Sequence, residues 1–525
     1  MTTTDRRRDI AVPSNQSTSV PSSHLPPSWL ITATVAGSLA LYFVLFLLLR
    51  GKSFRLTQTA TLYRWPSLGR LSDLLTPESL VTSSWTSEQA GVHEYVYLLV
   101  AAALVALWVL ALWLVRPGGR TLSLKWILIP IGLFSIPLFV LPGMFSGDIY
   151  LYMFYGRIIA RYAQNPILVP PDAFTGDPHL RWTYWTWLPS SYGPVWLMLS
   201  GALSAIAGQA LWANLFTYKA GVLVIHLLAT VVVWKLLRYA RPELASWGAV
   251  FYGWNPLVLF ETVGSGHNDV LVGLFTVLAL LAVVYNRWLY GVFFLVAAAM
   301  VKLMALVLLP VLILAWLRGL PTHEQRLRAG ASAAAVAVGG GLLLYAPLWG
   351  GTALFTNIRD NPAAREYQNS LWELFILKVT RPGFDPMYAV FSPDLDLFRN
   401  LAFVGVYFFL LWRLWKGQEM MDTMTWVWFA YFLFAAWFWP WYVLQLIPIA
   451  AVRGPGRAAA IAGGLTLGGM LFWLGWPEPA LPATPYFFNY RSVLMFAPAI
   501  VLALWPLRGL GRARGAARQP LEVGA

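Results

Sequence analysis

Long apolar segments alternate with short polar ones along almost the whole chain. The hydrocarbon core of a bilayer is about 30 Å thick, and about 20 helical residues cross it. Most of the apolar segments have that length or a little less, so the pattern predicts about 13 to 14 membrane-crossing helices. The expected spans are residues 29–49, 94–115, 126–142, 214–234, 244–262, 270–285, 288–301, 302–317, 330–349, 398–415, 424–437, 440–452, 458–475 and 490–507.

Basic residues between these spans predict the orientation of the chain. Cytoplasmic loops of membrane proteins are enriched in Lys and Arg, and alternate loops here are basic. We therefore expect a disordered cytoplasmic tail at 1–28, a polytopic domain at 29–507 and a basic cytoplasmic tail at 508–525. Residues 143–194 and 350–396 then form large loops outside the cytoplasm.

Two segments do not fit this alternation. Residues 195–208 are apolar but short, and we expect them to form an interfacial or re-entrant helix rather than a span. The predicted outer loop at 51–93 carries several basic residues, against the usual charge bias.

Composition supports the membrane class. Hydrophobic residues make up 58% of the chain and charged residues 11%, against about a quarter charged in soluble domains. The net charge of +14 lies largely in loops and tails, so it does not indicate a nucleic-acid partner. The chain has no cysteine, which excludes disulfides and cysteine nucleophiles. Its 28 tryptophans fit an aromatic-lined cavity or packing within the bundle.

An acidic residue follows the third predicted span in the sequence "FSGDIYLYMFYGRIIARYAQNP". If a helix begins near this acid, Asp148 shares a face with Tyr152 and Tyr155, because residues four and seven positions apart lie on one side. Arg157 and Arg161 fall on the opposite side and are not expected to pair with Asp148.

Two interpretations of Asp148 are open. Ser146 could cap the helix while the acid complements the positive end of the helix dipole. Alternatively, Asp148 is a general base at the membrane surface that removes a proton from an acceptor hydroxyl.

Polar residues also interrupt two later apolar segments. Polar groups at a span end are costly unless they are paired or functional, and "GHND" places His267, Asn268 and Asp269 at one. His267 could bind a sugar or a phosphate, or else Asn268 or Asp269 caps the next helix. Lys302 lies between two short apolar runs, where it either snorkels to the interface or pairs with an anionic lipid phosphate.

Aromatic and basic residues of the outer loops complete the candidate set. The loop at 164–194 contains several Trp and Tyr residues, including Trp185 and Tyr192, whose flat faces suit sugar rings or anchoring at the interface. Arg365 and Arg491 are candidates for binding an anion. The "DLD" sequence at 394–396 is too short to indicate a metal site, and no residue set has zinc-binding spacing.

Taken in order, these motifs resemble a known family. "SGDIYLYMFYGRIIARYAQNP", "SSYGPVW", "GSGHNDVLVGLFTVLALL", "AAAMVKLMALVLLP" and "WFWPWYVLQLIPIA" are similar to segments of polyprenol-phosphate-mannose-dependent α-mannosyltransferases of bacterial envelopes. These are integral membrane glycosyltransferases of the GT-C type. The resemblance covers about residues 140–450, and the ordered combination is more specific than any one motif.

The resemblance implies a function. Asp148 takes the position of the catalytic base, and His267, Asp269 and Lys302 take positions near the donor. The implied reaction transfers a hexose, with mannose as the expected sugar, from a polyprenyl monophosphate to a saccharide or lipoglycan acceptor. It takes place at the extracytoplasmic face of the cell membrane with inversion of configuration.

Residues and reaction chemistry add a pocket and a cofactor prediction. Tyr152, Tyr155, Trp185 and Tyr192 are expected to line the sugar and acceptor pocket. The phosphate leaving group needs only a nearby positive charge, so no cofactor or metal is required.

A transporter or flippase of lipid-linked saccharides is the alternative. Such proteins place polar pairs near the bilayer midplane and often contain inverted repeats. No internal repeat is visible here, and the informative polar residues lie at predicted span ends, with His226 among the few polar groups within a span. This distribution favours the enzyme.

Overall fold

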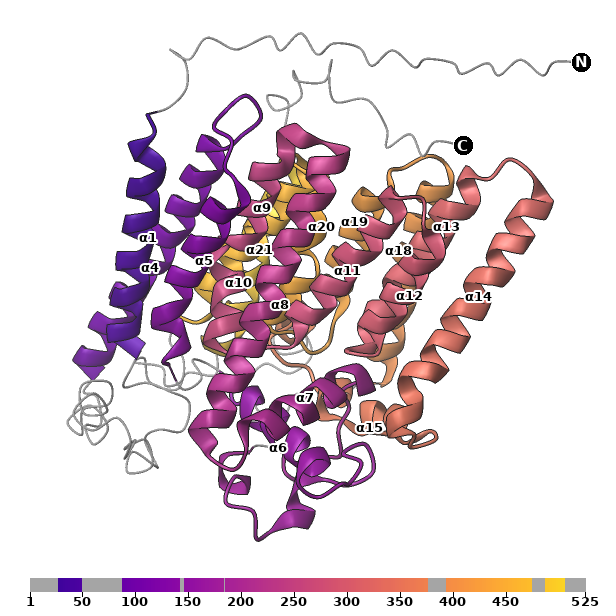
Figure 1. The fold of residues 1–525 in the computed structure, drawn as a ribbon, viewed down its shortest axis with the longest axis horizontal. Helices are drawn as coiled ribbons and strands as arrows, with labels where there is room; N and C mark the ends of the chain where they lie inside the picture. The colour runs from indigo at the N-terminus through magenta and orange to yellow at the C-terminus, as the bar shows by residue number, and fades with distance from the viewer. Residues whose placement is uncertain are drawn as a thin grey trace, which may run out of the picture.

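The structure is a computed structural model that describes residues 27–49, 87–141, 146–183, 185–375, 393–474 and 487–505. Within these ranges the chain is almost entirely helical, and Figure 1 shows the long helices side by side in one bundle. The bundle contains α1 (Trp29–Leu49), α4 (Ser87–Leu114), α5 (Leu124–Phe139), α8 (Leu211–Ala240), α9 (Ala245–Gly253), α10 (Pro256–Leu259), α11 (Asp269–Val284), α12 (Trp288–Ala299), α13 (Leu309–Gly319), α14 (His323–Tyr345), α18 (Pro393–Trp415), α19 (Met420–Phe434), α20 (Ile447–Arg453), α21 (Arg457–Phe472) and α22 (Phe487–Leu504).

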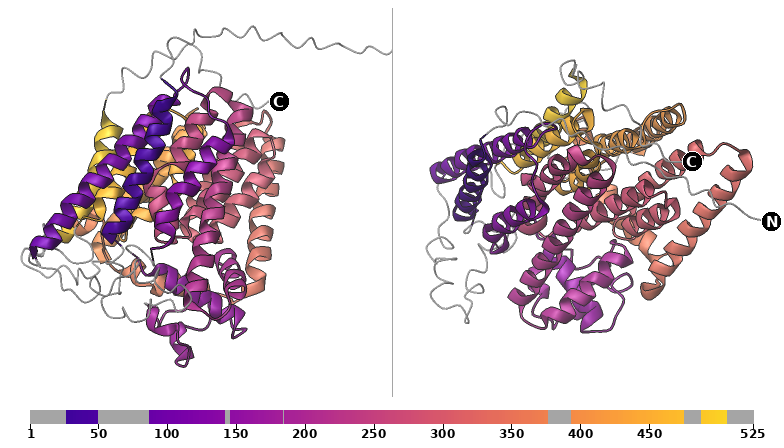
Figure 2. Two further views of the ribbon diagram at one scale, coloured as in Figure 1. Left: turned by 60° about the vertical axis from the view of Figure 1, so that its left-hand side comes forward. Right: turned by 45° about the horizontal axis from the view of Figure 1, so that its top comes forward.

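Shorter helices lie at the lower end of this bundle in Figures 1 and 2. They are α6 (Asp148–Ala160), α7 (Pro194–Ala207) and α15 (Ala353–Asp360). The short helices α16 (Pro362–Arg365) and α17 (Leu371–Phe375) follow α15 in the chain. Residues 194–207 thus form a helix that packs on α6 beneath the long helices. That residues 195–208 form an interfacial or re-entrant helix rather than a span stays a prediction.

Several helices within the described residues have the length and apolar composition of membrane spans. Five helices are long and apolar enough to cross a bilayer: Trp29–Leu49, Tyr95–Leu114, Leu211–Ala240, His323–Leu348 and Leu395–Trp415. Shorter apolar helices include Asp269–Val284, which packs on α8, and Arg457–Phe472, which packs on α4. The predicted all-α polytopic class is confirmed. The predicted number of spans stays a prediction.

The single helix predicted at 244–262 is wrong. The segment forms α9, then α10, and then a π-helical turn, η7 (Phe260–Gly264). Pro256 lacks the backbone N–H that a continuous helix needs, and Asn255 caps α10 by accepting a hydrogen bond from the Val258 N–H at 3.2 Å. Asn255 also donates to Thr466 at 2.9 Å, which ties the break to α21.

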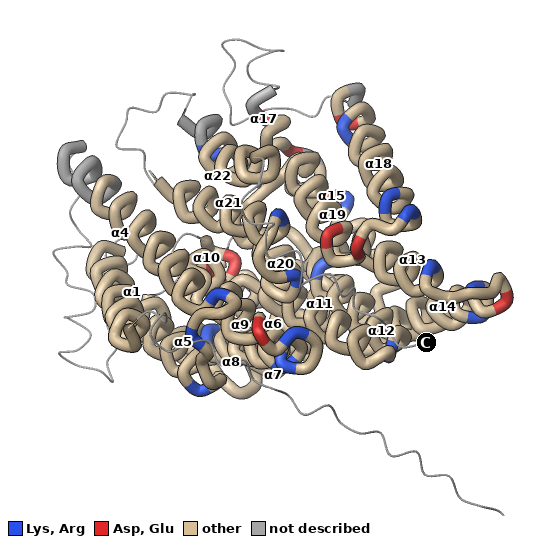
Figure 3. Tube along the Cα trace, turned by 90° about the horizontal axis from the view of Figure 1, so that it is seen from above, with Lys and Arg blue, Asp and Glu red and all other residues tan. Residues whose placement is uncertain are grey.

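The loops predicted to be cytoplasmic meet at the end of the bundle opposite α6. Arg241 donates to the carbonyls of Val452 and Arg453, and Arg318 donates to the carbonyls of Leu414 and Gln418. Figure 3, seen from above, shows Lys and Arg at the ends of α5, α13, α18 and α20. The basic loops therefore share one end of the molecule.

Candidate active site

Helix α6 begins at Asp148 and presents its carboxylate at the lower end of the bundle. The Ser146 hydroxyl accepts a hydrogen bond from the Asp148 N–H at 3.1 Å, but Gly147 is the N-cap residue and α6 has no side-chain cap. The Asp148 side chain is only partly buried, and Tyr152 Oη donates to its Oδ2 at 3.4 Å. The Ser146 contact involves the backbone of Asp148 and thus leaves the carboxylate itself available for chemistry.

The basic residues of α6 lie on the other side, as predicted. Arg157 donates to Asp177 Oδ2 through Nη2 at 2.7 Å and through Nε at 3.1 Å. Burial raises the pKa of Asp177, but hydrogen bonds from Arg157, from the His179 N–H and from Tyr162 outweigh burial and lower the pKa. These residues hold the loop after α6 and are not partners of Asp148.

Aromatic rings surround the Asp148 face of α6. Tyr152 and Tyr192 meet edge to face with ring centroids 5.0 Å apart. The ring centroids of Tyr155 and Tyr192 are 6.5 Å apart. Tyr155 Oη also donates to the Leu188 carbonyl at 3.0 Å, which fixes the outer loop against the helix. Trp185 packs against the same cluster as a partly buried residue. Of the predicted pocket aromatics, Tyr152, Tyr155 and Tyr192 therefore lie together.

Two motifs far apart in sequence are joined by their backbones. The Gly193 N–H donates to the Val301 carbonyl and the Val195 N–H to the Met300 carbonyl, both at 3.0 Å. A Cβ at Gly193 would lie 2.1 Å from the Met300 oxygen, so only glycine permits this approach. The pairing places Tyr192 next to the residue that follows Val301.

That residue is Lys302, which forms a buried ion pair. Lys302 Nζ lies 2.5 Å from Asp269 Oδ2, and Gln445 Nε2 donates to Asp269 Oδ1 at 2.7 Å. The ammonium also lies 5.0 Å from the ring centroid of Tyr442 and 5.8 Å from that of Tyr192. The Asp269 carboxylate engages these side chains and Asp269 is not the N-cap residue, so the alternative interpretation of Asp269 as a helix cap does not hold.

His267 lies beside this pair and is fully buried. Its ring stacks on Trp441 with centroids 3.9 Å apart, and its Nδ1 lies 3.2 Å from the Glu261 carbonyl and 3.0 Å from Glu261 Oε2. Asn268 precedes α11 but makes no side-chain cap. The capping interpretation of "GHND" therefore fails for Asn268 as well.

The charged groups lie close enough to influence one another. His267 lies within electrostatic range of Asp148, Asp269 and Lys302. Tyr152 and Tyr442 each lie within range of both Asp148 and Asp269. The turn before His267 lies close to α6. A Cβ added at Gly266 would lie 2.4 Å from Ile149 Cδ1. The structure thus gathers four of the predicted segments, which carry Asp148, Tyr192, the His267–Asp269 motif and Lys302.

Trp185 and Arg491 lie farther out. Trp185 has a positive φ of 56°, and its ring is 6.5 Å from that of Trp437. Arg491 is buried in α22, and its guanidinium lies 5.9 Å from the ring centroid of Phe472. The ring centroids of Phe472 and Trp439 are also 5.9 Å apart. Both residues therefore border the "WFWPWY" segment rather than the Lys302 pair.

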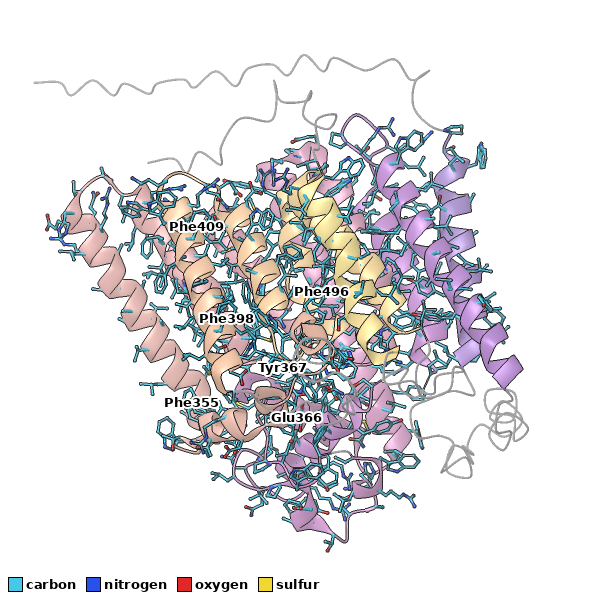
Figure 4. The ribbon with its side chains drawn as sticks, turned by 180° about the vertical axis from the view of Figure 1, so that it is seen from behind. Phe355, Glu366, Tyr367, Phe398, Phe409 and Phe496 are labelled. Carbon is cyan, nitrogen blue, oxygen red and sulfur yellow. The ribbon has the colours of Figure 1, made fainter. Side chains whose placement is uncertain are left out.

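Arg365 ends α16, and its side chain lies outside the described residues. The chain after it runs alongside the same aromatic segment. The Gln368 N–H donates to Ala436 and the Phe438 N–H to Gln368, both at 3.0 Å. Figure 4 shows Glu366 and Tyr367 at the lower end of the bundle. Tyr367 hydrogen-bonds Asp396 of "DLD", and Arg399 donates to the same carboxylate at 3.3 Å.

Sequence reasoning missed four residues of this site. Gln445 holds Asp269, Tyr442 covers Lys302, Trp441 supports His267, and Glu261 contacts its Nδ1. The first three belong to the "WFWPWYVLQL" segment, which already stood out as a motif. Glu261 carried a weaker signal, as an acid within an apolar segment.

Comparison with known proteins bears on this site. Residues 67–318 match the family model described as "Alpha-(1->6)-mannopyranosyltransferase, N-terminal domain". This match relates the chain to a mannosyltransferase family. The matched region includes Asp148, His267, Asp269 and Lys302.

Individual members of this mannosyltransferase family show the same relationship. The chain is 30% identical over 209 residues to alpha-(1->6)-mannopyranosyltransferase B of Corynebacterium glutamicum, covering 36% of this chain and 33% of that protein. It is 30% identical over 205 residues to alpha-(1->6)-mannopyranosyltransferase A of Mycobacterium tuberculosis, covering 36% of each. The matches thus span about a third of these relatives. The predicted resemblance to α-mannosyltransferases is confirmed.

Proposed function

We propose that this protein transfers a mannosyl group from a polyprenyl-monophosphate donor to a hydroxyl of a saccharide or lipoglycan acceptor. The observation that carries the proposal is the convergence of Asp148, His267 and the Lys302–Asp269 pair at one end of the helix bundle. The relatives' names support mannose as the sugar and an α-(1→6) linkage as the product.

Asp148 is the proposed general base. Its carboxylate is partly buried and lies at the start of α6. It accepts a long hydrogen bond from Tyr152, at 3.4 Å. The acceptor oxygen attacks the anomeric carbon while its proton passes to Asp148. The bond between that carbon and the phosphate oxygen breaks, and its electrons leave with the polyprenyl phosphate. A β-linked donor then gives an α-linked product, by analogy with inverting glycosidases.

Lys302 is the proposed contact for the donor phosphate. Its ammonium bears three hydrogens, and Asp269 accepts one of them at 2.5 Å. The others are available to phosphate oxygens, whose negative charge grows as the leaving group departs. Asp269 and Gln445 hold the lysine in place, so the positive charge is preorganised before the donor arrives.

A lipid-linked donor requires a site at the membrane surface. The basic loops lie at the other end of the bundle, and cytoplasmic loops are the ones enriched in Lys and Arg. On that rule the site faces away from the cytoplasm, where donors with isoprenoid tails would present their sugars.

A transporter is not favoured by the buried polar groups within the helices. His226 bonds the Gly253 carbonyl at 3.1 Å, next to the break before Pro256. Lys219 donates to the carbonyls of Leu138 and Leu141 at the end of α5. Both residues therefore satisfy backbone groups at helix ends and breaks, which is a structural role.

The test is transfer by the purified protein in lipid. Polyprenyl-phosphate mannose with a mannoside acceptor should give an α-mannoside, while GDP-mannose in the same assay should give none. The linkage is read by NMR of the isolated product. Movement of the lipid-linked sugar across proteoliposomes without any new glycosidic bond would establish the transporter instead.

A further inference from the structure

Glu261 is a fully buried carboxylate to which the mechanism above gives no role. It lies in the π-helical turn η7, and such turns frequently occur at functional sites. One carboxylate oxygen, Oε1, accepts a hydrogen bond from Trp473 Nε1 at 2.9 Å. The other, Oε2, lies 3.0 Å from His267 Nδ1.

These contacts fix which nitrogen of His267 carries hydrogen. Nδ1 lies 3.2 Å from the Glu261 backbone carbonyl, and a carbonyl oxygen can only accept. Nδ1 therefore donates to that carbonyl. The Glu261 carboxylate oxygen Oε2 lies beside Nδ1 as a charge contact and forms no hydrogen bond within the described residues. In the neutral imidazole the other nitrogen, Nε2, then carries a lone pair and can only accept.

Nε2 is buried and has no hydrogen-bond partner within the described part of the chain. The side-chain oxygen and nitrogen of Asn268 are also buried and have no hydrogen-bond partner among the described residues. Buried polar atoms in native proteins almost always have partners. These atoms lie on neighbouring residues, beside the Trp441 ring and within range of Asp148 and Lys302. They therefore form a place where a polar ligand binds.

The ligand must bring a hydrogen to Nε2. A sugar hydroxyl has one, whereas a phosphodiester has only acceptor oxygens. We propose that Glu261 is a positioning residue that holds His267 as a hydrogen-bond acceptor for one hydroxyl of the donor's mannosyl group. Asn268 binds a neighbouring hydroxyl, and Lys302 takes the phosphate. This inference rests on the proposed function and assigns His267 to the sugar, a choice that the sequence left open.

Donors lacking single hydroxyls test this assignment. A site built to bind a hydroxyl discriminates strongly against an analogue without it. The wild-type protein should lose roughly ten- to a hundredfold in kcat/KM on at least one of the 2-, 3-, 4- and 6-deoxymannose donors. Glu261→Gln and His267→Ala should lower kcat/KM for the natural donor and remove that discrimination. Combining them should add little to either alone.

Thr262→Val is the matched control. Thr262 is buried in the same turn, and its hydroxyl donates to the Val258 carbonyl at 2.6 Å rather than contacting His267. This variant perturbs η7 but should keep the wild-type preference among donors. If Glu261→Gln does not fold, Trp473→Phe replaces it, because it removes the N–H that holds Oε1. This variant should weaken the discrimination.

The outcomes are distinct. A wild-type protein that transfers mannose but treats all four deoxy donors alike overturns the inference. Wild-type discrimination retained in Glu261→Gln, or in Trp473→Phe where the first variant does not fold, overturns it too. Absence of wild-type transfer from any lipid-linked donor contradicts the proposed function itself.

Discussion

At the scale of single residues, the buried Lys302–Asp269 pair is the most consequential contact. The two side chains are 10% and 0% exposed, so neither charge is solvated by water. Losing one partner leaves the other as an uncompensated buried charge, which costs about 3–5 kcal/mol. The pair therefore links donor binding to the stability of the site.

A double-mutant cycle on this pair checks both roles. Lys302→Met should destabilise the protein by about 3–5 kcal/mol and abolish donor binding. Lys302→Met with Asp269→Asn should recover part of that stability but no donor binding, because the buried negative charge is gone while the cation is still missing. Thermal unfolding and donor titration measure the two effects.

The exposed ion pair between Arg328 and Glu324 supplies the control for this cycle. Its side chains are 79% and 71% exposed, and Arg328→Ala should change stability by at most about 1 kcal/mol. If Lys302→Met and Asp269→Asn changed the free energy of unfolding additively, this would contradict a buried Lys302–Asp269 ion pair.

At the scale of elements, the site depends on close backbone approaches. The strand-like contact between residues 193–195 and 300–301 brings Tyr192 to Lys302. A methyl group at Gly193 would meet the Met300 carbonyl at 2.1 Å. The motif "SSYGP" is therefore needed for its fit against "AMVK" as well as for its aromatic side chain.

Gly193→Ala should separate these two segments. We expect a loss of about 1–3 kcal/mol in stability from the steric clash, and a fall in kcat/KM for the donor. Gly132→Ala is the control, since a Cβ there meets no atom within 4 Å. Equal unfolding temperatures and equal transfer rates of the two variants would show that the approach is unimportant.

Local sequence patterns predicted which face of α6 carries site residues. They did not predict the long-range contacts made by the residues around that helix. The spacing of Asp148, Tyr152 and Tyr155 predicted the working face of α6, because helical periodicity depends only on neighbouring residues. Glu261 and Trp473 are 212 positions apart, and Asp269 and Gln445 are 176 positions apart. No local period connects such pairs, so only the fold reveals them. Pro256 was a visible signal for the break in the span at 244–262.

At the scale of the whole molecule, the lobe formed by α6, α7 and the loop between them carries Asp148. His179 is a buried neutral group of that lobe, and its Nε2 lies 3.0 Å from the Gln209 carbonyl. Burial, together with the charge of Arg157, lowers the pKa of His179 from 6.5 to about 4. The lobe therefore has a built-in sensitivity to acid.

Acidification should weaken this lobe between pH 6.5 and about 4. In that window the unfolded histidine takes up a proton and the folded one does not, so stability falls as pH falls, by up to roughly 3 kcal/mol. His179→Gln should remove this dependence when thermal unfolding is followed across the window. Parallel curves for the variant and the wild type would contradict it.

Asp177 does not interfere with this measurement. Its pKa is lowered from 3.8, so the stability it contributes is present above about that pH and is lost only as pH falls through the still lower folded value. Its titration therefore lies below the window in which His179 acts.

The central claim is that Asp148 removes the acceptor proton, and single-turnover transfer tests it most directly. Asp148→Asn keeps the size of the side chain and the Ser146 contact but cannot accept the proton. With polyprenyl-phosphate mannose saturating, mannosyl transfer should slow by about 10²- to 10⁴-fold, while donor affinity stays close to that of the wild type. Transfer at the wild-type rate by Asp148→Asn would contradict the account.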